Sequence, residues 1–165
     1  MLTDKKYNVA IIDDDQLMHE LLTDYLTSRF SGTVVTHYKT GEEALSENLK
    51  GQHLVLLDFH LSSNNHQGKN GLQVLKELCS TYIDLPVIVL SAQDNREIAM
   101  NIVKNGAWDY IIKNELAFDR LGIEVAKLMD RSDFESQHSD RVKFVRFSLV
   151  MATVLFFLLL SSKFM

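Results

Sequence analysis

Five apolar stretches of five residues each divide the first 112 residues of the chain. Val, Ile and Leu dominate them, and polar residues do not alternate regularly with apolar ones. This pattern is typical of strands that are buried on both faces of a parallel sheet. We therefore predict strands over Asn8–Ile12, Thr33–His37, His53–Leu57, Pro86–Leu90 and Trp108–Ile112.

Helical patterns lie between and after these stretches. Their apolar faces are Leu17, Leu21, Leu22, Tyr25 and Leu26; Leu75, Leu78, Cys79 and Tyr82; Ile98, Ile102 and Val103; and Leu121, Val125, Leu128 and Met129. Three helix ends carry capping signals: Thr40 with Glu43 for a short helix over about residues 41–49, Asp94 with Glu97 for a helix near residues 95–105, and Gly106 at the end of that helix. Strands that alternate with helices predict a (βα)₅ order, with a parallel sheet and helices on both faces.

Chemically reactive side chains gather where the predicted strands end, and ligands bind beyond that end of open α/β sheets. The residues concerned are Asp13, Asp14 and Asp15 after the first strand, Asp58 after the third, Ser91 after the fourth and Lys113 after the fifth. Neighbouring carboxylates repel one another, which raises their pKa values, and a divalent cation removes that cost. An all-oxygen site suits Mg²⁺, which also takes oxygens from phosphoryl groups.

One carboxylate of such a site can act as a nucleophile and form an aspartyl phosphate. Lys113 would then pair with the phosphoryl oxygens, and Ser91 would form a hydrogen bond with one of them. Taken singly, these residues have plainer explanations. An Asp at a strand end often only caps the next helix, which we expect of Asp15, and a single lysine is usually a solvated charge. Their joint placement at the ends of separate strands favours a functional site.

Four motifs resemble the receiver domains of two-component response regulators. They are Val-Ala-Ile-Ile-Asp13-Asp14-Asp15, Leu-Val-Leu-Leu-Asp58, Pro-Val-Ile-Val-Leu-Ser91-Ala92 and Gly-Ala-Trp-Asp-Tyr110-Ile-Ile-Lys113. The likeness covers about residues 7–131, and the motifs occur in order at suitable spacing. It implies the flavodoxin-like fold, a three-layer α/β sandwich with strand order 2-1-3-4-5.

The resemblance also implies a phosphorylation switch and not an enzyme with a separate substrate. Asp58 would accept a phosphoryl group from a histidine kinase or a phosphotransfer protein. Asp13, Asp14, Asp58 and the backbone carbonyl of His60 would hold Mg²⁺.

The same resemblance assigns the switch to Ser91 and Tyr110. Ser91 would move to the phosphoryl group, and the ring of Tyr110 would turn inward. A downstream protein would then dock near the fourth helix, the fifth strand and the fifth helix, because no output domain follows the receiver.

Two departures from the family pattern affect this site. Asn114 stands where a proline usually follows the lysine, and a cis bond before a non-proline residue costs about 2.5–4 kcal/mol. We expect a trans or strained peptide there, so the sequence does not predict how far the side chain of Lys113 reaches. The loop between Asp58 and the matching glycine, Gly71, carries extra polar residues around 63–68, and we expect its two histidines, at 60 and 66, to be solvated.

Charge is distributed unevenly along the chain. Residues 1–140 hold 13 basic and 22 acidic residues, a net charge of −9, whereas residues 141–165 hold 4 basic residues and no acids. The acidic body argues against nucleic-acid binding, which needs a basic face. The basic end precedes an apolar run, which favours a membrane.

Residues 147–162 form that run, which contains 16 residues without a charge. A helix of this length would measure about 24 Å, and flanking Arg146 and Lys163 could extend it toward the hydrocarbon thickness of about 30 Å. We expect a single-pass C-terminal anchor that holds the receiver on the cytoplasmic face of the inner membrane. The alternative is a cytoplasmic protein whose tail packs in an oligomer. The predicted parts are a receiver domain over 1–131, a polar linker over 132–141 and a hydrophobic C-terminal helix over 142–165.

Two other functions fit parts of the sequence. Asn114 and the long loop would also suit a receiver that is poorly phosphorylated and serves as a constitutive, membrane-tethered docking module. An aspartate-nucleophile phosphatase would place an Asp-x-Asp motif after the first strand, which Asp13 and Asp15 match only in part. The chain also lacks a segment that could serve as a substrate cap, so the receiver remains the main hypothesis.

Overall fold

The computed structural model describes residues 6–61 and 68–132. The chain divides into two compact units, Met1–Val125 and Ala126–Met165. The elements follow in the order β1 (Tyr7–Ile12), α1 (Gln16–Arg29), β2 (Thr33–Tyr38), α2 (Gly41–Ser46), β3 (Leu54–Asp58), α3 (Gly71–Thr81), β4 (Val87–Ser91), α4 (Arg96–Lys104) and β5 (Asp109–Ile112). A further helix is formed by residues 117–132.

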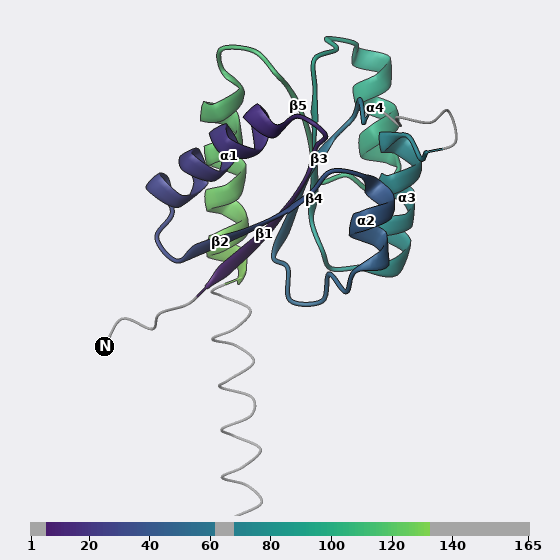
Figure 1. Cartoon of the computed structure of the whole chain (residues 1–165). Helices are drawn as coiled ribbons and strands as arrows, with labels where there is room; N and C mark the ends of the chain where they lie inside the picture. The colour runs from purple at the N-terminus through teal and green to yellow at the C-terminus, as the bar shows by residue number, and fades with distance from the viewer. Residues whose placement is uncertain (1–5, 62–67, 133–165) are drawn as a thin grey trace, which may run out of the picture. The chain divides into compact units, whose positions relative to one another are not determined.

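The five strands are parallel and lie in the order β2-β1-β3-β4-β5. Figure 1 shows α1 and the first part of the last helix, residues 117–125, on one face of the sheet, and α2, α3 and α4 on the other. The predicted flavodoxin-like fold and strand order are confirmed. Each strand begins and ends within one residue of its predicted bounds.

The central strands carry most of the core. Every residue of β3 and β4 is buried, as are all but one of β1. The edge strand β2 differs, because only Tyr38 is buried and Val34 is 43% exposed. The prediction that all five strands are buried on both faces is therefore wrong for β2. This strand contains two threonines and a histidine, and as an edge strand it has a neighbour on one side only.

The buried face of α1 also differs from the predicted one. Leu22 and Leu26 are buried as expected, but Leu17 and Leu21 are 61% and 45% exposed, and His19 is only 3% exposed. Positions 19, 22 and 26 follow the helical spacing of three and four residues. His19 therefore faces the core, where the apolar pattern had predicted Leu17 and Leu21.

The starts of α1 and α2 follow the predicted capping residues. The side chain of Asp15 accepts the Leu17 N–H, and the hydroxyl of Thr40 accepts the Glu43 N–H. The carboxylate of Glu43 accepts the N–H of Lys39 at 2.8 Å, one residue before the position that a capping box would use. The helix ends at Ser46, short of the predicted residue 49.

The predicted cap of α4 is wrong by one residue. Asn95, and not Asp94, caps this helix, because its side chain accepts the N–H groups of both Glu97 and Ile98. Gly106 follows the C-cap with a φ of 102°, a left-handed conformation that favours glycine, so its predicted role at the helix end is confirmed. Within α4, Ile102 is buried as expected.

Residues 133–165 lie outside the described residues. The predicted linker and hydrophobic helix, with their bounds, therefore stay predictions. Within residues 6–61 and 68–132, no helix is both long enough and apolar enough to cross a membrane.

Candidate functional site: a carboxylate cluster at the strand ends

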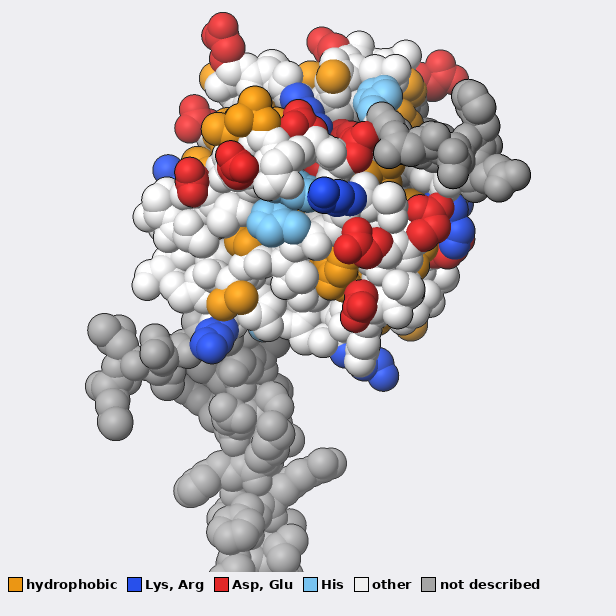
Figure 2. Space-filling model, in the orientation of Figure 1, with side chains coloured by type: hydrophobic (Ala, Val, Ile, Leu, Met, Phe, Trp, Pro, Cys, Tyr) orange, Lys and Arg blue, Asp and Glu red, His pale blue; other side chains and the backbone are white. Residues whose placement is uncertain are grey.

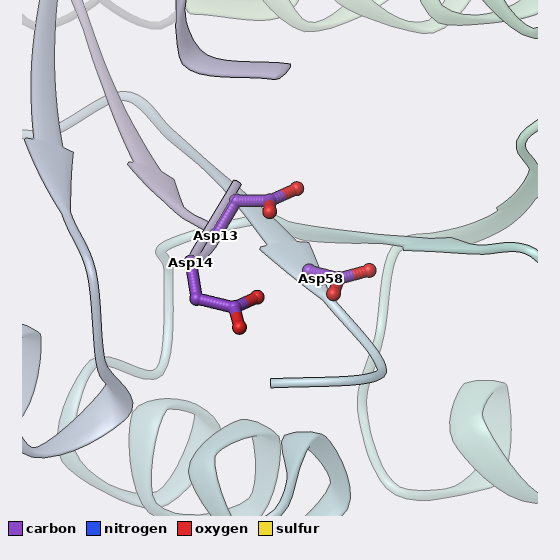
Figure 3. Close-up of side chains that lie close together, drawn as sticks. All are labelled: Asp13, Asp14 and Asp58. Carbon is purple, nitrogen blue, oxygen red and sulfur yellow. The ribbon is translucent and has the colours of Figure 1, made fainter. Parts of the chain in front are cut away.

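The carboxyl ends of neighbouring strands bring three aspartates together. Asp13 and Asp14 directly follow β1, and Asp58 is the last residue of the adjacent β3. One carboxylate oxygen from each lies within 4.8 Å of the others, and Figure 3 shows the three groups just beyond the ends of these strands. Asp13 and Asp58 are buried, whereas Asp14 is exposed. We call Asp13, Asp14 and Asp58 the carboxylate cluster.

Lys113 reaches this cluster from the far side of β4. Its Nζ lies 2.8 Å from Asp58 Oδ1 and 3.1 Å from Asp13 Oδ2. The peptide bond between Lys113 and Asn114 is trans. The absence of the family's proline therefore does not prevent the lysine from contacting both buried carboxylates.

Burial and charge shift the pKa values of this site in ways that oppose one another. Burial raises the pKa of Asp13, and the charge of Asp58 adds to this, while the Asp15 N–H and Lys113 act to lower it. Burial alone would lower the pKa of Lys113, but its hydrogen bonds and ion pairs with Asp58 and Asp13 outweigh burial and raise it. The predicted increase from crowded carboxylates is confirmed for Asp13, although burial is the larger cause.

The donor set of the cluster fits a divalent cation. Three carboxylates and one ammonium leave a formal charge of −2, which a divalent ion would balance. All the side-chain donors are oxygens, and the exposed Asp14 leaves one side open to water, as Mg²⁺ prefers.

Ser91 and Tyr110 are joined through a residue that the sequence did not single out. The N–H of Gln93 donates to Ser91 Oγ at 3.1 Å, and the Tyr110 hydroxyl donates to the carbonyl of Gln93 at 2.8 Å. Ser91 is fully buried, and the Tyr110 ring is only 4% exposed, so it already points inward. Gln93 contributes only its backbone to this link, which is why its side-chain type gave no signal.

The segment that follows Asp58 packs tightly against α3. A Cβ added to Gly71 would lie 2.6 Å from the carbonyl oxygen of Phe59 and 3.0 Å from that of Asp58. Only glycine fits there without displacing this backbone, which supports Gly71 as the glycine predicted to follow the loop. His60 is exposed and its ring meets Phe59 edge-on, while the extra loop residues 62–67, with the second histidine, lie outside the described residues.

The comparisons with known proteins agree on one family. The sequence profile described as "Response regulator receiver domain" matches residues 9–127. The probable C4-dicarboxylate response regulator DctR of Bacillus subtilis (strain 168) is 32% identical over 110 residues, which are 66% of this chain and 46% of that protein. The transcriptional regulatory protein CssR of the same organism is 31% identical over 126 residues, 74% of this chain and 51% of that protein.

Solved structures show the same architecture. The receiver domain of the Francisella response regulator 1452 has a TM-score of 0.62 and 28% identity, over 77% of this chain and 99% of that one. The signal receiver domain of a putative Luxo repressor protein from Vibrio parahaemolyticus has a TM-score of 0.67 over 80% of this chain and 96% of that one; at 24% identity it supports the fold alone. The chain matches about half the length of the two Bacillus regulators.

Proposed function

This chain belongs to the response regulator receiver family, and from that premise we propose that Asp58 is its phosphoacceptor. Receivers are typically phosphorylation switches and not enzymes in the ordinary sense. The observation that carries the assignment is the position of Asp58. It ends the central strand β3, lies in the carboxylate cluster, and is held 2.8 Å from the Lys113 ammonium.

The proposed step transfers a phosphoryl group from the phosphohistidine of a histidine kinase or phosphotransfer protein. A carboxylate oxygen of Asp58 attacks phosphorus and forms a P–O bond, while the P–N bond to the donor breaks and the donor histidine takes up a proton. Lys113 can pair with the phosphoryl oxygens from its position between Asp58 and Asp13. Ser91, at the end of the next strand, supplies a hydroxyl for another of these oxygens.

Asp13, Asp14 and Asp58, with the backbone carbonyl of His60, are the proposed ligands of Mg²⁺. When bound, the ion would offset the repulsion within the cluster and bind phosphoryl oxygens. Asp13 also accepts the Asp15 N–H at 2.9 Å, which orients its carboxylate.

We place the output of the switch at the groove along α4 and β5. This groove has a volume of about 660 Å³, and Met100, Val103, Tyr110 and the Asp109–Arg120 ion pair line it. A turn of Ser91 toward a phosphoryl group would change its hydrogen bond with the Gln93 N–H, and the Gln93 carbonyl in turn accepts the hydroxyl of Tyr110. The contacts at Gln93 thus offer a route from Asp58 to a downstream protein.

Labelling by a small phosphodonor in Mg²⁺ tests the assignment. Asp58→Asn should abolish labelling while the fold stays intact, because an amide oxygen is a far weaker nucleophile than a carboxylate. Asp15→Asn is the matched control, since asparagine caps a helix as well as aspartate does and Asp15 lies outside the cluster. Unchanged labelling of Asp58→Asn would refute the assignment, and a parent that is never labelled would indicate the constitutive docking module instead.

We also propose that the tail anchors the receiver to the cytoplasmic face of the inner membrane. The support comes from the sequence of residues 141–165, with its basic flank, 16-residue uncharged run and lack of acids. On an insertion scale of about −0.3 to −0.6 kcal/mol for each central Leu, Phe or Val, insertion should be favourable by roughly 3–6 kcal/mol. Acidic and basic side chains are both spread over the face of the described residues in Figure 2, and no basic patch that would attract anionic lipids stands out on that face.

Fractionation of the full chain against a version that ends at Asp140 tests this anchor. The full chain should pellet with membranes and need detergent for extraction, whereas the shortened chain should stay in the supernatant. A full chain that remains monomeric in the supernatant without detergent contradicts the anchor.

A further inference from the structure

Three hydrogen bonds around Asn114 hold the backbone that follows β5. The N–H of Asn114 donates to the carbonyl of Ile112 at 2.8 Å, and its carbonyl accepts the N–H of Ala117 at 3.0 Å. Its side-chain Oδ1 accepts the N–H of Leu116, also at 3.0 Å. Asn114 thus closes the turn through both its backbone and its side chain.

A pocket of about 210 Å³ borders this turn, lined by Lys113 and Asn114 together with Met18, Leu22, Phe118 and Leu121 from α1 and the last helix. Side chains do not fill this space, so the hydrogen bonds of the turn contribute to holding the backbone there.

The position of the Lys113 ammonium depends on the backbone of this turn. Its backbone N–H is fixed to the carbonyl of Ser91 at 2.7 Å on the strand side. On the other side it is joined to Asn114, and its long side chain must reach Asp58 and Asp13 together. A rotation of the turn would shift the ammonium relative to both carboxylates, because a displacement at the backbone is amplified along the side chain.

We propose that Asn114 is a positioning residue for Lys113, acting through the bond from the Leu116 N–H to its side chain. The inference about phosphoryl transfer rests on the proposed function, whereas the inference about the position of Lys113 does not. Asparagine, aspartate and serine can all accept a hydrogen bond of this kind, and alanine cannot.

The first experiment reads Lys113 directly, without Mg²⁺ or phosphodonor. NMR of the full chain in detergent would follow the ε-methylene resonance of Lys113, assigned by its loss in Lys113→Arg. Asn114→Ala should shift this resonance toward the values of a solvated lysine, and Asn114→Ser should restore it. A resonance in Asn114→Ala that is the same as in the parent overturns the proposal, as does an equal shift in the Ser and Ala variants.

The second experiment measures the rate of labelling by acetyl phosphate in Mg²⁺. Asn114→Ala should be slower by about fivefold, the ratio expected if the lost hydrogen bond is what favours the productive position of Lys113, and Asn114→Ser should approach the parent rate. Thr40→Ala is the control, because it removes a similar cap from α2, away from Lys113, and should leave the rate unchanged. Equal slowing in Thr40→Ala would mean that the loss is a general effect of stability and would overturn the proposal. If the parent is never labelled, the proposed function fails, and the NMR result still decides the role of Asn114.

Discussion

Two groups of titratable side chains lie near the carboxyl ends of β1 and β2, each with buried and exposed members, and they are built on opposite principles. The carboxylate cluster joins groups of like charge and adds Lys113, which contacts two of them. The histidine pair, His19 of α1 and His37 of β2, stacks two weakly basic rings with their centroids 4.5 Å apart. The first group brings charges together, whereas the contacts of the second favour a neutral His37.

The contacts of the histidine pair support this difference. His37 Nε2 lies 3.0 Å from the Thr23 hydroxyl, which also donates to the carbonyl of His19. The buried Nε2 of His19 has no hydrogen-bond partner among the described residues. Burial lowers the pKa of His37, and the nearby His19 lowers it further. Both effects favour the neutral form of His37, so the pair contributes packing and carries no obvious chemistry.

Removal of one carboxylate should change the cluster most. Asp14→Ala should weaken Mg²⁺ binding by about tenfold or more, because a ligand and a negative charge are both lost. Without metal the variant should be at least as stable as the parent, because repulsion within the cluster falls. Calorimetric Mg²⁺ titration and denaturant unfolding measure the two effects. Equal Mg²⁺ affinity in both proteins would place the ion elsewhere.

The sequence predicts the cluster well because each of its members follows a strand directly. Once β1 and β3 are recognised as parallel strands, Asp13, Asp14 and Asp58 must lie at one edge of the sheet. The reach of Lys113 could not be predicted, because it depends on the backbone path through the following turn. The strand bounds are predicted within one residue, since apolar runs and the polar residues after them mark both ends.

The histidine pair shows what the pattern could not predict. His19 breaks the apolar face of α1, and His37 lies in a strand whose exposure depends on its place at the edge of the sheet. Their contact arises only when α1 crosses the sheet, so no local signal in the sequence indicates it.

The cap of α4 was missed for a related reason. Asp94 and Asn95 are both good capping residues, and only the backbone geometry decides between neighbours.

A second prediction concerns the link from the cluster to Tyr110. Ser91→Ala should still be phosphorylated, because Asp58 and Lys113 remain, but the phosphorylation-induced shifts around Tyr110 should be smaller than in the parent. The variant should also lose about 1 kcal/mol of stability, because the Gln93 N–H loses its acceptor. NMR spectra with and without phosphodonor measure the shifts, and Ser91→Thr, which keeps the hydroxyl, is the control. Full shifts around Tyr110 in Ser91→Ala would show that the signal takes another route.

The smallest expected effect tests whether the fold keeps His37 neutral. A His37 pKa below its ordinary value of 6.5 means that the unfolded chain binds a proton more readily than the folded one. Above this pH both states are neutral at His37 and the pair has no effect on the pH dependence. As the pH falls below 6.5, the unfolded state gains protons first, so the free energy of unfolding decreases. The loss should be less than about 1 kcal/mol, because solvent screens the exposed part of the ring.

Unfolding of the parent and of His37→Gln in denaturant, at pH 7.5 and at pH 5.5 and without metal, measures this contribution. Asp13 acts in the opposite direction, since its raised pKa makes folding more favourable in acid, so neither protein alone isolates the histidine. The carboxylate cluster is the same in both proteins, and its contribution cancels in the difference between them. The parent should therefore lose more stability, or gain less, than His37→Gln on acidification. The contrary result is a difference in free energy of unfolding between the two proteins that is the same at both pH values. That result would mean that the fold does not hold His37 neutral. The histidine pair would then differ from the carboxylate cluster in packing alone.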